Sequence, residues 1–593
     1  MKYPTLYTKQ NSRQMVDVFK GYNHNLRIGD GEFFDMKNMT SDHYPILAPR
    51  GSRGEHPSGH GEVTGLIAKD SLCYVSGRYF VINEYTIDMG LTYGPKQLIS
   101  MGAYVIIMPD KMYINTQDLT DFGNIEAFFP GVEGQDVTAI YEMCKVDGTV
   151  YDQAAASSSA PVNPLNMQLW IDTSSTPHVL KQYSEVSSVW VQIPTTYIKI
   201  SAPNIAAAFS QYDAVKISGL PVDVPQLNEL NGQMFPLWDV YHDPNDGHDD
   251  YIVIVGILDE RVSSTTKLRA ERTMPVMDFV IESDNRLFGC RYGPAANGEV
   301  VNEIYASKLG DFKNWNCFMG ISTDSWVDSC GTDGQFTGAI THGGYPLFFK
   351  ETCLHKVYGK YPANFQTQTT PCAGVQQGCS KSLAIVNTTL FYKSRSGVCA
   401  YDGSLPNTIS YALGNEVYSD AVGGANGNKY YVSMKNADGI WNLFVYDTAK
   451  GMWHREDNLH VSAFCSCKGE LYCIDADRQN IITLLGSGDE YEEEVKWMVE
   501  TGELGLSSPD MKYISRLTIR MSMEVGSELN IYAQYDLSDY WEHICNIRGT
   551  NLRSFSMPIR PRRCDHIKIR IEGRGMAKIY GWTKTIEQGS EIS

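Results

Sequence analysis

The feature that most constrains the fold of this chain is a short strand motif that recurs at a spacing near 40 residues. In each copy a turn residue precedes an apolar–aromatic pair, and successive copies are 60, 43, 40 and 41 residues apart. The copies are residues 285–288 (NRLF), 344–348 (GYPLF), 387–391 (NTTLF), 427–431 (GNKYY) and 469–472 (GELY). Such a period in a strand-rich chain is typical of propeller blades, which need roughly 40–50 residues for four strands.

Strand-like runs of four to seven residues, bounded by Gly, Asn, Asp or Pro, occur along the whole chain. One short helical candidate spans Ile205 to Val215. This pattern predicts an all-β protein. Leu72 and Tyr104 lie in contexts similar to the repeat, which brings the candidate blades to seven. Stacked β-sandwiches whose strands share the spacing by chance are the alternative.

One repeat unit shows the order of residues in more detail. A double glycine at 423–424 precedes a strand, and a Tyr-Asp turn at Tyr446, then Gly451 and Trp453, follow. This order resembles a kelch-type blade. We expect the glycines to allow tight turns between strands. We expect Tyr446, Gly451 and Trp453, with Trp315 in an earlier unit, to pack the blades.

The chain has 593 residues, more than a single core holds, because cores tend to divide beyond roughly 250–300 residues. The repeat is interrupted between Tyr104 and Leu287, and clean alternation replaces it after about residue 490. We therefore predict a β-propeller of about seven blades with an inserted β-rich domain and a C-terminal β-sandwich. The expected parts are an N-terminal arm or docking segment (1–55), the first blades (56–124), the insert (125–275), the remaining blades (276–494) and the sandwich (495–593).

The charge of the chain is acidic, with 50 Lys and Arg against 69 Asp and Glu and a net charge of −19. A protein whose main task is to grip nucleic acid needs a basic surface, so that class is disfavoured. An acidic wall would suit a protein past which DNA slides. No apolar stretch reaches the ~18 residues of a membrane helix, and the N-terminus lacks the apolar core of a signal peptide. We expect no membrane anchor.

The 14 cysteines are scattered through strand-like segments. A disulfide framework belongs to short secreted chains, so we interpret these as reduced, mostly buried thiols of a protein made in a cytoplasm. The tightest group is Cys465, Cys467 and Cys473. It lacks the paired CxxC spacing of zinc sites, so buried strand thiols are favoured over a metal site.

The sequence contains no GxSxG, HExxH or Walker phosphate loop, and no GxGxxG after a strand. We therefore expect no catalytic residue, no cofactor and no metal, and predict that the chain is not an enzyme. Two segments keep alternatives open. The acidic loop 239–250 offers oxygen ligands of the kind that Ca²⁺ takes, although a solvated loop is the commoner explanation. Residues 307–315 resemble the Asp-box turn of propeller glycosidases with Asp and Gly transposed.

Residues 560–570 form a locally basic run that ends in the alternating sequence HIKIRI. One interpretation is a contact with DNA or with an acidic partner. The other is an exposed strand whose charged residues protect a sheet edge. We favour an interface or edge protection.

Several long segments resemble structural proteins of tailed phages. Residues 19–54 are similar to the N-terminal segment of such proteins, and residues 282–318, 374–403 and 429–456 are similar to their blades. The architecture resembles the tail nozzle of short-tailed phages, the class also called packaged-DNA stabilisation or tail tubular protein B. The patterns are loose and cover nearly the whole chain; the insert and the terminal sandwich are where it departs from them.

This resemblance implies a structural protein of the virion tail, assembled in the host cytoplasm. It implies a ring of six copies below the tail adaptor, through which genomic DNA is retained and then ejected. The implied partners are further copies of this chain, adaptor and portal-side proteins, tail fibres or the tail tip, and double-stranded DNA in transient contact. A related possibility is that the protein lies in the tail tip of a long-tailed phage.

The N-terminal segment is polar and rich in turns, with too little apolar surface for a domain of its own. We therefore expect it to contact a neighbouring protein, and expect deletion of residues 1–50 to abolish assembly while the propeller still folds. The expected interface residues are Phe19, Tyr22, Asn25, Arg27, Asp35, Pro45, Arg50 and Arg53.

Two other functions stay open. The chain would alternatively be a carbohydrate-binding or glycan-cleaving propeller of the tail tip that acts at the host surface. A cellular kelch-like scaffold is the weaker possibility, because no partner-recruiting domain accompanies the blades.

Overall fold

The computed structural model describes residues 11–57, 61–152, 154–295, 298–506, 511–536 and 538–588. Strands make up 52% of the chain and helices 2%, which confirms the all-β class. Among the described residues the helical elements are α1 (Pro225–Asn228), η1 (Pro362–Asn364), η2 (Ser380–Ser382) and η3 (Ser410–Leu413). The helix expected at 205–215 is absent from this described stretch, which forms turns and the start of β22 (Ala214–Ser218).

The chain divides into two compact units. The first contains Met1–Leu98, Gly334–Lys356 and Thr369–Ser593, and the second contains Ile99–Asp333 and Val357–Gln368. No helix among the described residues is long and apolar enough to cross a membrane.

Seven antiparallel sheets in the described part of the chain have the four-strand order of propeller blades. Five belong wholly or mostly to the first unit: β7 (Val63–Ala68), β8 (Leu72–Ser76), β9 (Tyr79–Ile82) and β10 (Tyr85–Asp88); β32 (Gly338–His342), β33 (Tyr345–Lys350), β34 (Cys353–Tyr358) and β35 (Gln366–Pro371); β36 (Ala384–Val386), β37 (Thr389–Ser394), β38 (Gly397–Tyr401) and β39 (Asn407–Thr408); β40 (Tyr418–Asn426), β41 (Lys429–Asn436), β42 (Trp441–Asp447) and β43 (Met452–Arg455); and β44 (Val461–Cys467), β45 (Glu470–Asp475), β46 (Asn480–Thr483) and β6 (Gly54–His56). Two belong to the second: β11 (Gln97–Met101), β12 (Tyr104–Met108), β13 (Met112–Asn115) and β14 (Phe122–Asn124); and β28 (Phe279–Ser283), β29 (Arg286–Pro294), β30 (Val300–Ala306) and β31 (Trp326–Ser329).

The five copies of the sequence repeat lie at the same place in their blades, the second strand and the turn before it. Leu287, Leu347, Leu390, Tyr430 and Leu471 lie there and are fully buried. Each of these five blades therefore presents one large apolar side chain from its second strand to the core between blades, and this requirement produces the period.

Neighbouring blades of the first unit pack through their faces. One core joins β40–β42 to β44–β46, and another joins β7–β9 to β44 and β45. The first strands β36, β40, β44 and β7 follow one another as neighbours. In the second unit, the blades that begin with β11 and β28 share a core that contains Phe312 and Trp315.

The blade of β44–β46 takes its fourth strand from the opposite end of the chain. Glu55 and His56 of β6 pair with Ile482 and Ile481 of β46. On its other side β6 pairs with β47 (Asp489–Glu490). The N-terminal segment thereby completes a blade whose other strands lie more than 400 residues later.

The insert between β14 and β28 forms its own β-rich domain in the second unit, with a core around Tyr141, Ile198 and Ile254. Its strands are β15 (Ala127–Phe129), β16 (Val137–Cys144), β17 (Ala155–Ser157), β18 (Leu169–Asp172), β19 (Val179–Ser184), β20 (Val189–Gln192), β21 (Tyr197–Ser201), β22, β23 (Gln233–Pro236), β24 (Asp239–Tyr241), β25 (Tyr251–Val255), β26 (Val262–Thr266) and β27 (Arg269–Arg272). They form the sheets β15-β27-β22-β23, β24-β25-β21-β16-β26 and β17-β18-β19-β20.

The C-terminal strands form a sandwich around one long bent strand, β49 (Lys512–Tyr535). Its first half pairs with β52 (Ala577–Gln588) and its second half with β51 (Ile567–Arg574), while β50 (Glu542–Ser556) pairs with both halves. Alternate residues of β49 are buried, as the clean alternation in its sequence predicts. The fold class predicted from the sequence is confirmed: an all-β propeller with an inserted β-rich domain and a C-terminal sandwich.

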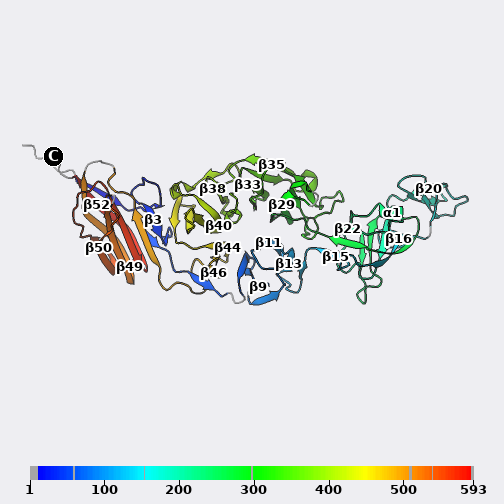
Figure 1. Cartoon of the computed structure of the whole chain (residues 1–593), viewed down its shortest axis with the longest axis horizontal. Coiled ribbons are helices and arrows are strands. Elements are labelled where there is room, and N and C mark those ends of the chain that lie inside the picture. Colours follow the sequence, from blue (N-terminus) through cyan, green and yellow to red (C-terminus); the bar gives the residue numbers. More distant parts are fainter. Residues whose placement is uncertain are drawn as a thin grey trace, which may run out of the picture. The chain divides into compact units, whose positions relative to one another are not determined.

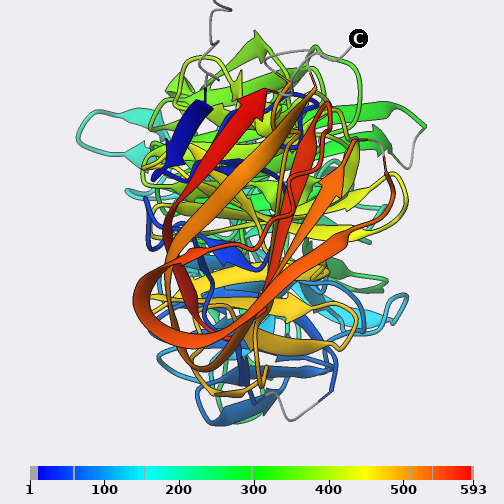
Figure 2. The ribbon, with the colours of Figure 1, turned by 90° about the vertical axis from the view of Figure 1, so that its left-hand side faces the viewer.

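Strands from the N-terminal segment complete this sandwich. β1 (Asn11–Val16) pairs with β52, and β3 (Glu32–Lys37) pairs with β48 (Lys496–Thr501). Figure 1 shows β3 beside the C-terminal strands, and Figure 2 shows β1, in dark blue, next to the red β52. A short hairpin of β4 (Met39–Thr40) and β5 (Ala48–Pro49) follows β3.

The sandwich and one blade are parts of a single hydrogen-bonded sheet. β2 (Gly21–Tyr22) pairs with β3 on one side and with β43 on the other, so the order runs β1-β52-β49-β51-β48-β3-β2-β43-β42-β41-β40. The N-terminal segment is the link between them.

Candidate functional site

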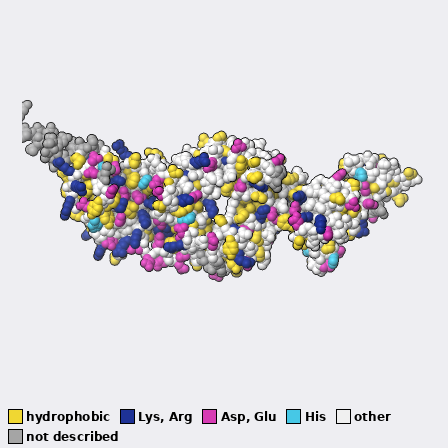
Figure 3. Space-filling view, in the orientation of Figure 1, with side chains coloured by type: hydrophobic (Ala, Val, Ile, Leu, Met, Phe, Trp, Pro, Cys, Tyr) yellow, Lys and Arg dark blue, Asp and Glu magenta, His cyan; other side chains and the backbone are white. Residues whose placement is uncertain are grey.

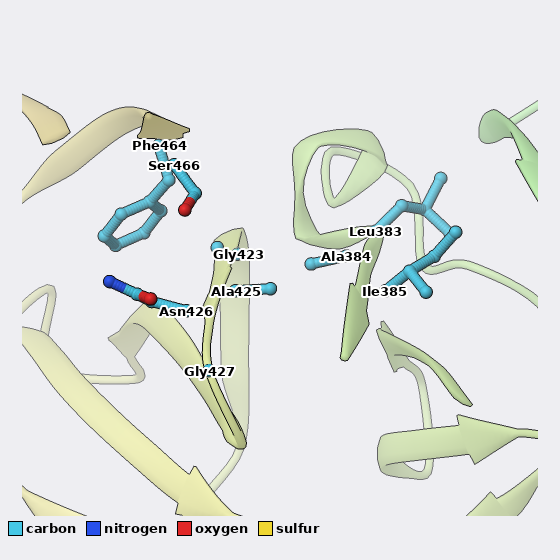
Figure 4. Close-up of a pocket in the computed structure, with 10 residues that line it drawn as sticks. Leu383, Ala384, Ile385, Gly423, Ala425, Asn426, Gly427, Phe464 and Ser466 are labelled. Carbon is cyan, nitrogen blue, oxygen red and sulfur yellow. The ribbon is translucent and has the colours of Figure 1, made fainter. Parts of the chain in front are cut away.

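A pocket of about 430 Å³ lies on the first strands of three neighbouring blades of the first unit. Its lining comes from β36 and the residue before it, from the end of β40 and from β44. Figure 4 shows Phe464 and Ser466 on one side and Leu383 and Ile385 on the other, with the β40 segment between them. The lining residues are Leu383, Ala384, Ile385, Gly423, Gly424, Ala425, Asn426, Gly427, Phe464 and Ser466.

Two glycines shape this pocket by allowing backbone segments of neighbouring blades to approach each other closely. A Cβ on Gly424 would lie 2.5 Å from Cβ and Cγ of Phe464, and a Cβ on Gly423 would lie 2.5 Å from the carbonyl oxygen of Ser382. Both glycines lie inside β40, paired with Tyr431 and Val432. The expectation that they allow a turn between strands is therefore corrected: they let neighbouring blades touch.

The pocket lining carries no charged side chain among the described residues. It offers the Phe464 ring, the Ser466 hydroxyl and the Asn426 amide, whose Nδ2 donates to the carbonyl oxygen of Gly469 at 3.1 Å. Lys381, two residues before the lining residue Leu383, donates to the carbonyl oxygen of Ser462 at 2.9 Å, and desolvation by the surrounding protein lowers the pKa of Lys381. The pocket fits a neutral, hydroxyl-bearing ligand better than a charged one.

A second pocket, of about 370 Å³, lies within the insert. Its lining includes Glu142, Asp152, Asp259 and Glu260, with Arg261 beside them. Arg261 pairs with Glu142 at 3.0 Å. Asp259 is held by two neighbours: His178 Nδ1 lies 2.8 Å from Oδ1, and Gln226 Nε2 donates to Oδ2 at 2.7 Å. Several carboxylates thus meet one small cavity, an arrangement that sequence spacing did not reveal.

Four of the residues expected at an intermolecular interface are buried inside this chain. Phe19, Tyr22, Arg50 and Arg53 are 3%, 4%, 6% and 2% exposed. The Phe19 ring packs edge-on against Trp582 of β52 at 5.4 Å. The prediction that these four contact a neighbouring protein is therefore wrong, because they complete the cores and ion pairs of their own sheets.

The two arginines form a buried network with three carboxylates. Arg53 bonds Asp457 at 2.6 Å and Glu456 at 2.7 Å, and Arg50 bonds Glu492 at 2.7 Å. Burial by itself would raise the pKa of Asp457 and Glu492, but the two guanidinium groups and their hydrogen bonds outweigh it and hold both pKa values below the ordinary range. The network fastens the N-terminal segment to the loop after β43 and to the segment after β47.

The other expected interface residues differ in their placement. Asn25 Nδ2 donates to the carbonyl oxygen of Tyr411 at 3.0 Å, and Asp35 pairs with Arg455 at 2.9 Å, so both bind within the chain. Arg27 and Pro45 are exposed, and their contact with a partner stays a prediction. Residues 1–10 lie outside the described residues.

The residues expected to pack blades lie as follows. Trp453, 2% exposed, donates from Nε1 to the carbonyl oxygen of Ile409 at 3.0 Å, and its ring lies 5.0 Å from that of Tyr446. Gly451 has a φ of +65° in the turn between β42 and β43. Trp315, also 2% exposed, lies in the core of the second unit.

The described residues contain no group of three or more His, Cys, Asp or Glu placed to hold a metal ion. In the acidic loop, buried Asp250 accepts the backbone N–H of Asp243 at 2.6 Å and lies 2.8 Å from His242 Nδ1, so its carboxylate orders the loop.

Cys465 lies near Cys467 and Cys73, and burial raises the pKa of the Cys465 and Cys73 thiols to about 12.

Two further segments are also placed. Residues 307–315 form the connection between β30 and β31, in which Asp311 accepts the Asn314 amide at 2.6 Å. The HIKIRI strand is β51, which pairs with β48 on one side and β49 on the other. Edge protection is therefore wrong for this strand, because it lies inside its sheet and Arg570 pairs with Glu500 at 2.7 Å.

Comparison with known proteins yields structures of low similarity. No protein-family model matches the chain, and no curated protein does. An exo-β-1,3-galactanase from Phanerochaete chrysosporium matches with 8% identity over 51% of this chain and 94% of that one, at a TM-score of 0.21. PorZ, a bacterial surface component of the type-IX secretion system of Porphyromonas gingivalis, matches with 8% identity over 90% and 82%, at 0.23. An acylaminoacyl peptidase from Pyrococcus horikoshii matches with 10% identity over 61% and 56%, at 0.24.

These matches correct one expectation. The expectation that the chain is not an enzyme is not upheld, because the matched structures include glycoside hydrolases and a peptidase. At these TM-scores the likeness assigns no reaction, substrate or partner to this chain.

Proposed function

We propose that the chain is a structural component of a phage tail, which forms an oligomeric ring through which genomic DNA is retained and then ejected. One observation carries the proposal: residues 11–56, most of which belong to the segment that resembles tailed-phage proteins, supply strands to the sandwich and to two blades. A wall that encloses packed DNA must resist force without its parts separating. A blade and a sandwich that share one hydrogen-bonded sheet meet that requirement.

Charge supports the same proposal. The chain has a net charge of −19, and double-stranded DNA carries one negative charge per about 1.7 Å of its axis. Copies of an acidic chain around a channel would repel DNA rather than bind it, and DNA could then pass without adhering.

Microscopy of the purified full-length chain tests this proposal. Negative-stain images and mass photometry, with and without co-expressed tail proteins of the same genome, are expected to give closed rings of several copies. Isolated particles under every condition, including co-expression, would contradict it.

A second candidate is a propeller that binds or cleaves carbohydrate at a host surface. The two pockets favour it: the 430 Å³ pocket offers an aromatic ring with neutral polar groups, and the 370 Å³ pocket gathers four carboxylates. Glycan arrays and hydrolysis assays on cell-wall sugars test it with matched variants. Loss of a signal in Phe464→Ala would assign binding to the first pocket, and loss of hydrolysis in Glu260→Gln would assign cleavage to the second.

A further inference from the structure

Three arginines lie on the outer face of the sandwich sheet that contains β1, β52 and the first half of β49. The register places Arg13 and Arg516 on either side of Thr585. Arg520 lies four residues further along β49, opposite Gly581 and Ser554. All three arginines are exposed. We call Arg13, Arg516 and Arg520 the arginine face.

The arginine face has no carboxylate in ion-pair distance within the described residues. Arg516 donates only to the Ser556 hydroxyl, at 3.3 Å. The nearest acidic residues on these strands are Glu587, two residues from Thr585, which accepts the hydroxyl of Tyr513 at 2.6 Å, and Asp17 beside Gly581. Between them lie Thr518, Thr583 and exposed Met15, so the face is basic and hydroxyl-rich with one apolar side chain.

Unpaired arginines are unexpected in a chain with so many carboxylates. Some exposed arginines elsewhere in the first unit are paired, for example Arg78 with Asp88 and Arg395 with Glu351, each at 2.7 Å. Residues 495–593 contain 14 Lys and Arg against 12 Asp and Glu, whereas residues 1–494 contain 36 against 57. Positive charge is therefore concentrated in the sandwich part of the chain.

The first unit also carries exposed carboxylates that lack a cation. Asp489 and Glu490 of β47 and Glu493 after it are exposed, and no ion pair of theirs occurs among the described residues. Figure 3 shows Lys and Arg over the C-terminal strands at the left and a group of Asp and Glu at the lower edge of the same unit. We call Asp489, Glu490 and Glu493 the acidic segment.

We propose that the arginine face of one copy binds the acidic segment of a second copy. The two surfaces have opposite charge, and neither has an ion pair among the described residues of its own copy. Their spacings are compatible. Arg13 and Arg516 are two strands apart, about 10 Å, and Glu490 and Glu493, three residues apart, can span up to about 11 Å. The two surfaces differ, so the contact is heterologous, and repeating it closes a ring or extends a filament. This inference rests on the self-assembly in the proposed function and names the surfaces that perform it.

A charge-swap experiment on the full-length chain tests the pairing. The variants are R516E/R520E, E490R/E493R, and the two combined, with K360E/K468E as a control that makes the same change of charge at two exposed lysines elsewhere. Sedimentation or mass photometry measures self-association at about 0.05 and 0.5 M salt. Circular dichroism confirms that each variant is folded.

We expect each charge reversal to weaken self-association at least tenfold, the combined variant to regain most of it, and the control to behave as wild type. Association of the wild type should fall with salt, because screening shortens from about 10 Å at 0.1 M to about 3 Å at 1 M. Rings that form equally well with R516E/R520E would overturn this pairing and leave the proposed function intact. Reversals that abolish assembly without rescue in the combined variant would also overturn it. Absence of any wild-type ring, alone or with tail proteins, would overturn the proposed function as well. A wild-type monomer that binds duplex DNA through these arginines would show a different partner and refute the pairing.

Discussion

Tyr22 of β2 lies directly opposite Trp453 of β43, although 430 positions separate them in the sequence. Both side chains are buried, at 4% and 2% exposure. This pair is the point at which the blade of β40–β43 continues into the sandwich through the N-terminal segment. The segment is therefore part of the fold rather than an arm that extends from it.

Deletion of residues 1–50 tests this placement. It removes β1 to β5 and Arg50, so a sandwich edge, the strand between blade and sandwich, and part of the charged network are lost. Native stability is about 5–15 kcal/mol, and we expect the product to be insoluble or to lose its near-UV circular dichroism. The variant Arg27→Ala, at an exposed position of the same segment, should unfold in urea as wild type does. A soluble deletion product with native spectra would restore the earlier expectation of a separate arm.

Substitution of Arg53 by Met tests the buried network. The change leaves Glu456 and Asp457 without their closest cation, and breaking one side of a buried pair costs about 3–5 kcal/mol. Urea unfolding measures the loss. Arg395→Met is the control: this arginine is 72% exposed beside Glu351, and its loss should cost less than about 1 kcal/mol. Equal effects of the two substitutions would refute a structural role for the network.

His454 makes stability depend on pH. Burial, with the nearby Lys429, lowers the pKa of His454 to about 3, and its side chain is 4% exposed. In the unfolded chain a histidine pKa is about 6.5. Below that pH the unfolded state binds a proton that the folded state does not, so stability falls as pH falls.

At pH 5 the expected loss from His454 is about 2 kcal/mol relative to pH 7, at 1.36 kcal/mol per pH unit. Urea midpoints at the two pH values measure it. His454→Gln should reduce the difference, whereas His248→Gln, at a side chain that is 73% exposed, should leave it unchanged. An unchanged difference in His454→Gln would show that other groups dominate. Asp457 and Glu492 add a further loss in the same direction at lower pH, since their folded pKa values are lowered.

Gly424→Ala tests the close approach of two blades. The added Cβ would lie 2.5 Å from Phe464 atoms, and forced overpacking costs about 1–3 kcal/mol. Gly331→Ala is the control, because its Cβ would meet no atom within 4 Å. Thermal unfolding compares the two variants. A Gly424→Ala protein as stable as the control would show that β40 and β44 can separate at little cost.

The blades were predictable from the sequence because each needs a buried residue in its second strand. Leu287, Leu390 and Leu471 repeat that requirement at a regular spacing. The insert and the sandwich followed from the interruption and the end of the repeat. The buried face of β49 was also predictable, because the alternation of apolar and polar residues that buries every second side chain lies within one continuous segment.

The N-terminal strands were not predictable from local pattern. β2 has two residues and β6 three, too few to show a period, and Asn11 pairs with Glu587 at the far end of the chain. The apolar residues of this segment looked too sparse for a core because the rest of the core comes from the sandwich. The pockets were hidden for a related reason: Gly424 and Phe464 belong to different blades, and only the packing of blades brings them together.

Direct imaging of the purified full-length chain tests the central claim, that copies of this propeller assemble around a channel. The account predicts closed rings in negative stain. In mass photometry it predicts particles whose mass is a fixed multiple of 66.4 kDa. Particles of single-chain mass, alone and with co-expressed tail proteins, would contradict it.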